Sequence, residues 1–139
     1  MSSELYHTEL VARARRAFGE GRLATPAASI TLDNPLCGDR VTLDLQRRDG
    51  AVAAIGHEVK GCLLCAASAA TIAEFGRNRT PAELREMAAA AIALMKDGTP
   101  APERFAALGV FSPVHASKSR RDCVLLPFEA LGKVLDAAF

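Results

Sequence analysis

Residues 41–60, VTLDLQRRDGAVAAIGHEVK, contain the clearest strand in the sequence. Its start alternates strictly, with Val41, Leu43 and Leu45 on one side and polar residues on the other, which is typical of a strand with one buried face. An Asp-Gly pair then predicts a tight turn, and residues 51–60 can return as an antiparallel partner strand. This stretch therefore predicts a β-hairpin.

The sequence on either side extends the hairpin into a domain. Residues 27–32, AASITL, predict a third strand, so a three-stranded antiparallel sheet is expected across residues 27–60. Residues 4–18 before it carry apolar side chains at helical spacing. From residue 62 onward, several segments are rich in helix formers. Strands followed by helices predict an α+β fold, with an N-terminal helix and C-terminal helices packed on one face of the sheet.

Length and charge narrow the class of protein. The chain has 139 residues and a formal net charge of +1, which predicts one domain over residues 1–139 and gives no electrostatic sign of a nucleic-acid partner. Charged residues interrupt its apolar runs before the roughly 20 residues that a membrane span needs. The N-terminus also lacks the basic and apolar regions of a signal peptide. We therefore expect a cytoplasmic protein without a membrane partner.

Four cysteines are the main chemical feature, at Cys37, Cys62, Cys65 and Cys123. Their spacing is not that of a zinc ribbon, in which two close pairs face each other. A shared site must therefore be assembled by the fold. From spacing alone, three unrelated buried thiols remain an alternative, because cysteine is among the most buried residue types.

The surroundings of the cysteines favour a metal site. Cys62 and Cys123 each begin a predicted helix, where the unpaired N–H groups and the helix dipole favour thiolate, the form that binds metal. Asp39 follows Cys37 by two residues and can complete a tetrahedral set of three sulfurs and one oxygen, or it can cap a turn. Cys65 lies one turn beyond Cys62, and it can pack inward or serve as an auxiliary ligand, a resolving thiol or a sulfur acceptor.

Three blocks of sequence carry a family resemblance: NPLCGDRV at 34–41, KGCLLCAASAA at 60–70 and SRRDCVLLPFEAL at 119–131. Their content and order resemble the cysteine blocks of the IscU/SufU/NifU N-terminal-like family of iron-sulfur cluster assembly scaffolds. The resemblance implies the SufE/NifU-like α+β fold described above, and it covers nearly the whole chain.

The resemblance also implies a set of site residues. In that family the first cysteine, the aspartate two residues later, the glycine-preceded cysteine and the last cysteine gather at one end of the domain and bind zinc, iron or a nascent cluster. The corresponding residues here are Cys37, Asp39, Cys62 and Cys123, and Cys37 is the candidate sulfur acceptor. Cys65 is not a standard ligand of the family.

Two further features refine the resemblance. The long separation of Cys62 and Cys123 is similar to the SufU branch, which carries an insertion between these cysteines, expected here as a loop-rich stretch at residues 90–112. Arg120 takes the place of a basic residue three positions before the last cysteine, where it can act as a charge partner of the site. Asp122 stands where IscU proteins carry histidine, so a histidine ligand is excluded there.

Three functions are consistent with these residues. The first is a scaffold, more a carrier than an enzyme, which accepts sulfur from a cysteine desulfurase, builds a transient [2Fe-2S] cluster and passes it to an apo iron-sulfur acceptor protein. The second is a zinc-dependent sulfurtransferase that takes persulfide sulfur from a SufS-type desulfurase. The third is a structural zinc domain, which an oxygen ligand disfavours because structural zinc sites mostly use sulfur and nitrogen.

Overall fold

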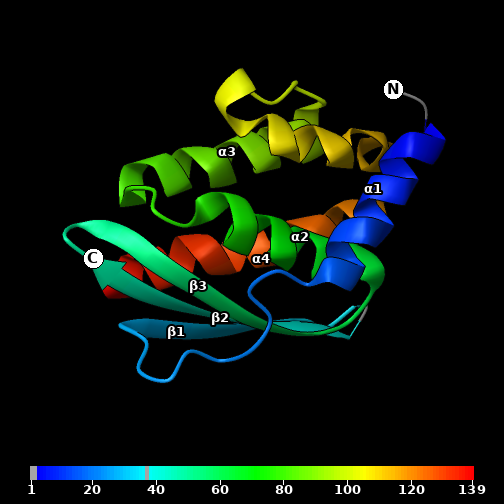
Figure 1. The fold of residues 1–139 in the computed structure, drawn as a ribbon. Helices are drawn as coiled ribbons and strands as arrows, with labels where there is room; N and C mark the ends of the chain where they lie inside the picture. The colour runs from blue at the N-terminus through cyan, green and yellow to red at the C-terminus, as the bar shows by residue number, and fades with distance from the viewer. Residues whose placement is uncertain (1–2, 37) are drawn as a thin grey trace.

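The structure is a computed structural model that describes residues 3–36 and 38–139. As expected, an N-terminal helix is followed first by the three strands of one sheet and then by a set of helices (Figure 1). In chain order they are α1 (Ser3–Arg16), β1 (Ala28–Asn34), β2 (Asp39–Arg48), β3 (Ala51–Lys60), α2 (Leu63–Gly76), α3 (Pro81–Asp97), the 3₁₀ segment η1 (Glu103–Ala116) and α4 (Lys118–Ala138).

The sheet is the predicted antiparallel meander, in the order β1-β2-β3. The hairpin between β2 and β3 turns at Asp49 and Gly50, whose φ angles of 52° and 76° match the left-handed turn that an Asp-Gly pair favours. The alternation in β2 is confirmed, since Val41, Leu43 and Leu45 are all completely buried. These side chains are the contribution of β2 to the hydrophobic core.

Helices cover one face of this sheet in two layers (Figure 1). In the first layer α4 packs over β1 and β2, and α2 packs over β3. In the second layer α3 lies on α4, and η1 lies on α3, while α1 packs along α2. The α+β class with helices on one face is therefore confirmed. None of the helices among the described residues is both long enough and apolar enough to cross a membrane.

A loop protects the outer edge of β3. His57 N donates to Gly19 O at 3.2 Å, and Gly21 N donates to His57 O at 2.7 Å. These bonds pair the backbone of an edge strand that would otherwise be available to another chain. The same loop brings Arg22 and Leu23 to the Asp44 carboxylate on the outer face of the sheet.

The prediction of a loop-rich insertion at residues 90–112 is wrong. Helix α3 begins with a capping box, and its alanine-rich run continues the helix as far as Asp97. Gly98 then ends the helix in the left-handed conformation, with φ 70°. Because η1 begins at Glu103, only residues 98–102 connect the two helical segments.

Candidate metal centre

Asp39 is placed by the alternation of β2. It is an even number of residues from Val41 and Leu43, so its side chain lies on the helix-facing side of the sheet, at the end of the strand. The strand partner of Asp39 is Asn34. Asp39 is only 4% exposed, and none of the ion pairs between described residues involves it. A carboxylate this buried needs hydrogen-bond donors or a cation.

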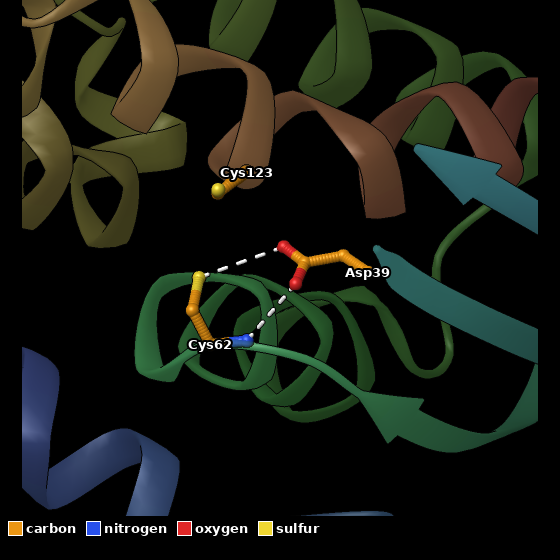
Figure 2. A group of neighbouring side chains, drawn as sticks. All are labelled: Asp39, Cys62 and Cys123. Atoms are coloured by element: carbon orange, nitrogen blue, oxygen red, sulfur yellow. Dashed lines mark hydrogen bonds between the residues drawn. The ribbon is translucent and has the colours of Figure 1, made fainter. Parts of the chain in front are cut away.

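Cys62 supplies those donors from the start of α2. It is the N-cap residue, with extended φ and ψ of −76° and 169°, and its carbonyl accepts the first helical bond from Ala66 N at 3.1 Å. Cys62 N donates to Asp39 Oδ1 at 3.2 Å, and Cys62 Sγ lies 3.6 Å from Asp39 Oδ2 (Figure 2). The prediction that Cys62 stands at a helix start is confirmed, and its side chain is exposed.

Gly61 makes this close approach possible. A Cβ atom at Gly61 would lie 2.5 Å from Asp39 Oδ1 and 2.7 Å from Asp39 Cγ. Both distances are far below van der Waals contact, so a side chain at Gly61 would displace the carboxylate from Cys62. The glycine of the GC pair was visible in the sequence, but its steric role depends on a residue on another strand and could not be seen there.

Cys123 reaches the same place from α4. Its Sγ, Cys62 Sγ and an Asp39 carboxylate oxygen all lie within 4.8 Å of one another, and Figure 2 shows the Cys123 sulfur facing the other two side chains. Cys123 is 9% exposed, and its thiol donates to Ser119 O at 3.5 Å. Three segments far apart in the sequence thus bring two sulfurs and a carboxylate together.

The prediction that Cys123 begins a helix is wrong. α4 already begins at Lys118, and Arg121 N donates to Ser117 O at 2.9 Å, so Cys123 lies in the second turn. Ser117 at the N-cap is a residue type that helix starts favour, but it makes no side-chain cap hydrogen bond, and the first turn is basic without an acidic residue, opposite to the charge pattern that helix starts favour. Burial raises the pKa of the Cys123 thiol, and the neighbouring Cys62 sulfur and Asp39 carboxylate raise it further. Without a cation, the site therefore favours the protonated thiol over the expected thiolate.

The remaining candidate residues have different positions. Cys37 lies outside the described residues. Cys65 belongs to the first turn of α2, and its side chain is completely buried in the hydrophobic core. Arg120 is exposed on the first turn of α4, and among the described residues it forms no ion pair with Asp39.

The three grouped donors suit a thiophilic cation. Sulfur ligands favour zinc, iron and iron-sulfur clusters, and a carboxylate oxygen is also an accepted ligand of zinc. A cation bound here would also displace the proton of the Cys123 thiol, because a coordinating thiol is deprotonated. Two sulfurs and one oxygen are one donor short of a tetrahedral set.

Comparisons with known proteins identify relatives of the chain among solved structures. No protein-family model and no curated protein sequence matches the chain. Among solved structures, the N-terminal part of a nitrogen-fixing NifU-like protein from Brucella abortus is 36% identical, with a TM-score of 0.90 over 97% of this chain and 94% of that chain. A candidate iron-sulfur cluster assembly scaffold protein for the SUF system from Fervidobacterium islandicum AW-1 is 24% identical, with a TM-score of 0.87 over 97% and 99% of the two chains.

The Brucella protein carries the assignment, because its identity extends over nearly the full length of both chains. The Fervidobacterium protein adds a likeness of fold. The family resemblance that the three cysteine blocks indicated is confirmed by the Brucella protein. The chain belongs to the NifU-like N-terminal family.

Proposed function

We propose that this chain is a cytoplasmic, single-domain scaffold, over residues 1–139, for iron-sulfur cluster assembly. In this role it binds iron or zinc, accepts sulfur from a cysteine desulfurase, builds a [2Fe-2S] cluster and passes the cluster to an apo acceptor protein. The observation that carries the proposal is the convergence of Asp39, Cys62 and Cys123 within 4.8 Å from three separate elements.

The donor set supports temporary binding. Cys62 is exposed at the N-cap of α2, where an acceptor protein can reach it. Asp39 supplies an oxygen, a harder donor than sulfur, and iron-sulfur clusters are held most firmly by four thiolates. We assign Cys37 as the remaining ligand and the first sulfur acceptor, and Arg120 as a charge partner for the loaded site, both on the family resemblance.

Anaerobic reconstitution tests the proposal. Ferrous iron, cysteine and a cysteine desulfurase should give the absorption of a [2Fe-2S] cluster on the wild-type protein, and the cluster should move to an apo-ferredoxin. Cys62→Ser and Cys123→Ser should abolish stable cluster binding, because each removes a sulfur donor. Asp33→Asn is a matched control, since Asp33 is an exposed carboxylate that pairs with Arg40.

The same assay separates the alternative function. Zinc is held by the same kinds of donor. If no cluster forms, and the zinc-loaded protein instead accelerates desulfurase turnover and gains a persulfide, the scaffold function is refuted and the chain is a sulfurtransferase. Cluster formation followed by transfer would support the scaffold function.

A further inference from the structure

The two cysteines at the start of α2 occupy paired positions that the metal site does not explain. Cys62 is the N-cap residue, which makes Cys65 the third residue of the helix. Cys62 is exposed, whereas Cys65 is completely buried in the core. An exposed and a buried thiol in a C-x-x-C motif at a helix start is the arrangement of dithiol-disulfide oxidoreductases.

The start of α3 shows how side chains at these two positions meet. There Thr80 is the N-cap residue and Glu83 is the third helical residue. Thr80 Oγ1 donates to Glu83 Oε1 at 3.2 Å. Reciprocal contact between the N-cap and the third residue is a general property of helix starts. The backbone at the start of α2 is also extended at the N-cap and then helical, so Cys62 and Cys65 stand three residues apart across the first turn, a spacing at which side chains occupy neighbouring positions on a helix.

We propose that Cys62 and Cys65 form a reducing dithiol that converts sulfur delivered to Cys62 into sulfide. This inference rests on the proposed function, because it assigns the fate of the sulfur once it has passed from the first acceptor of the site to Cys62. Persulfide sulfur is at the oxidation level of the element, whereas the bridging sulfur of a cluster is sulfide, so cluster assembly needs two electrons for each sulfur. The dithiol supplies these electrons within the same chain.

The step is an intramolecular thiol-disulfide exchange. Cys65 Sγ attacks the inner sulfur of the Cys62 persulfide, a Cys62–Cys65 disulfide bond forms, and the bond from Cys62 Sγ to the outer sulfur breaks. The outer sulfur leaves as hydrogen sulfide, taking the proton of the Cys65 thiol. An external dithiol of the thioredoxin class then reduces the disulfide, after which Cys62 can again bind metal.

Exposure selects Cys62 as the loaded member of the pair. Among the described cysteines, Cys65 is completely buried and Cys123 is 9% exposed, whereas Cys62 is open to solvent. Burial does not prevent Cys65 from attacking, because its target is a side chain on the preceding turn of backbone. Burial does prevent other thiols from capturing the sulfur at Cys65.

Mass spectrometry of the metal-free protein tests the step. The full chain is reduced, desalted under anaerobic conditions and treated with a limited amount of sodium polysulfide, without desulfurase or iron. Trypsin cleavage after Lys60 and Arg77 then places both cysteines on the peptide of residues 61–77, while Cys123 is on the peptide of residues 122–133. Omission of polysulfide is the control, in which residues 61–77 should remain a dithiol.

In the wild type, the peptide of residues 61–77 should be lighter by the mass of one hydrogen molecule, with one sulfide released for each disulfide. Cys65→Ala should retain the persulfide on Cys62 and release sulfide about tenfold more slowly. Cys65→Ser should behave in the same way, and circular dichroism should show that both variants are folded. The wild-type disulfide is measured independently of either variant.

Three results would overturn the inference: equal retention of persulfide in the wild type and Cys65→Ala, extra sulfur on Cys65, or no persulfide on Cys62 in Cys65→Ala. The outcome is separable from the scaffold function, because polysulfide replaces both the desulfurase and iron. A protein that forms the disulfide but assembles no cluster would refute the scaffold alone. Cluster assembly without the disulfide would refute the dithiol step alone.

Discussion

Two buried carboxylates on the same strand serve different purposes. Asp44 lies in the middle of β2 on the outer face of the sheet, and its side chain is completely buried. It accepts hydrogen bonds from Arg22 at 2.7 and 3.1 Å, from Leu23 N at 3.0 Å and from Ser29 Oγ at 2.5 Å. Asp39 lies at the end of β2 on the helix-facing side, and Cys62 is its donor among the described residues.

The difference shows how a buried acid can serve structure or binding. The hydrogen bonds to Asp44 occupy both of its oxygens and balance its charge, so the carboxylate fastens a loop to the sheet and has no capacity for a ligand. Asp39 keeps a carboxylate beside two sulfurs, where a cation can supply the compensation that Asp44 receives from Arg22. We therefore expect substitutions to separate folding stability at Asp44 from metal handling at Asp39.

The largest expected loss of stability comes from Asp44→Ala. The substitution removes the acceptor shared by Leu23 N, Ser29 and Arg22, and it should lower the free energy of unfolding by about 2 kcal/mol. A larger loss is not expected, because the half-exposed Arg22 can be hydrated once Asp44 is gone. Urea denaturation of the metal-free protein measures the change. Asp33→Ala is the control and should change stability by less than about 1 kcal/mol, since its pair with Arg40 is exposed. Equal losses in the two variants would contradict the structural role of Asp44.

The fold could be predicted largely from sequence because its signals are local. Strict alternation in residues 41–46 and the Asp-Gly turn specified the central hairpin, and the structure confirms both. Alanine-rich segments indicated the helices. Helix boundaries were harder to predict. The start of α4 was predicted at Cys123, five residues too late, because its first turn carries basic residues that oppose the helix dipole.

The site could be predicted only in part. Three cysteine blocks indicated which residues would meet, and the structure brings together Asp39, Cys62 and Cys123. The contact between Asp39 and Gly61 could not be predicted, because it joins two segments through the packing of β2 against the start of α2. The outer-face role of Asp44 was likewise hidden, since a polar residue on an alternating strand is usually exposed to solvent.

The contribution of Asp44 to the stability of the fold should be lost in a defined range of acidic pH. Burial opposes ionisation of Asp44, but the hydrogen bonds from Arg22, Ser29 and Leu23 N outweigh it and hold the pKa of Asp44 below its usual range. A lowered pKa in the folded state contributes stability above the unfolded pKa, and that contribution is lost as the pH falls through the folded value. The difference in free energy of unfolding between the wild type and Asp44→Asn should therefore be complete at pH 7 and shrink below about pH 4. A difference that stays constant to pH 3 would contradict the assignment.

Gly61→Ala should affect both folding and metal binding, because it acts at the contact with Asp39. The new methyl group would lie 2.5 Å from Asp39 Oδ1, so we expect the free energy of unfolding to fall by roughly 1 to 2 kcal/mol. Zinc affinity, measured by competition with a chromogenic chelator, should fall as well. Gly132→Ala is the matched control, since its Cβ would enter open space, and alanine should stabilise α4 by about 0.5 to 1 kcal/mol. Unchanged zinc affinity in Gly61→Ala would show that the close approach of residue 61 to Asp39 does not affect metal binding.

Asp39→Ala should cost the metal-free protein the least stability and change metal release the most. It removes the acceptor for Cys62 N, worth about 1 kcal/mol, but also a buried carboxylate that lacks an ion pair among the described residues. In the proposed site Asp39 supplies an oxygen donor beside the Cys62 sulfur, with Asp39 Oδ2 3.6 Å from Cys62 Sγ, and an oxygen donor holds an iron-sulfur cluster less firmly than thiolate does. Transfer of a reconstituted cluster to apo-ferredoxin should therefore be slower in Asp39→Ala than in wild type or Asp33→Ala. Equal transfer rates would contradict a role for Asp39 in cluster release and leave its contrast with Asp44 without a functional consequence.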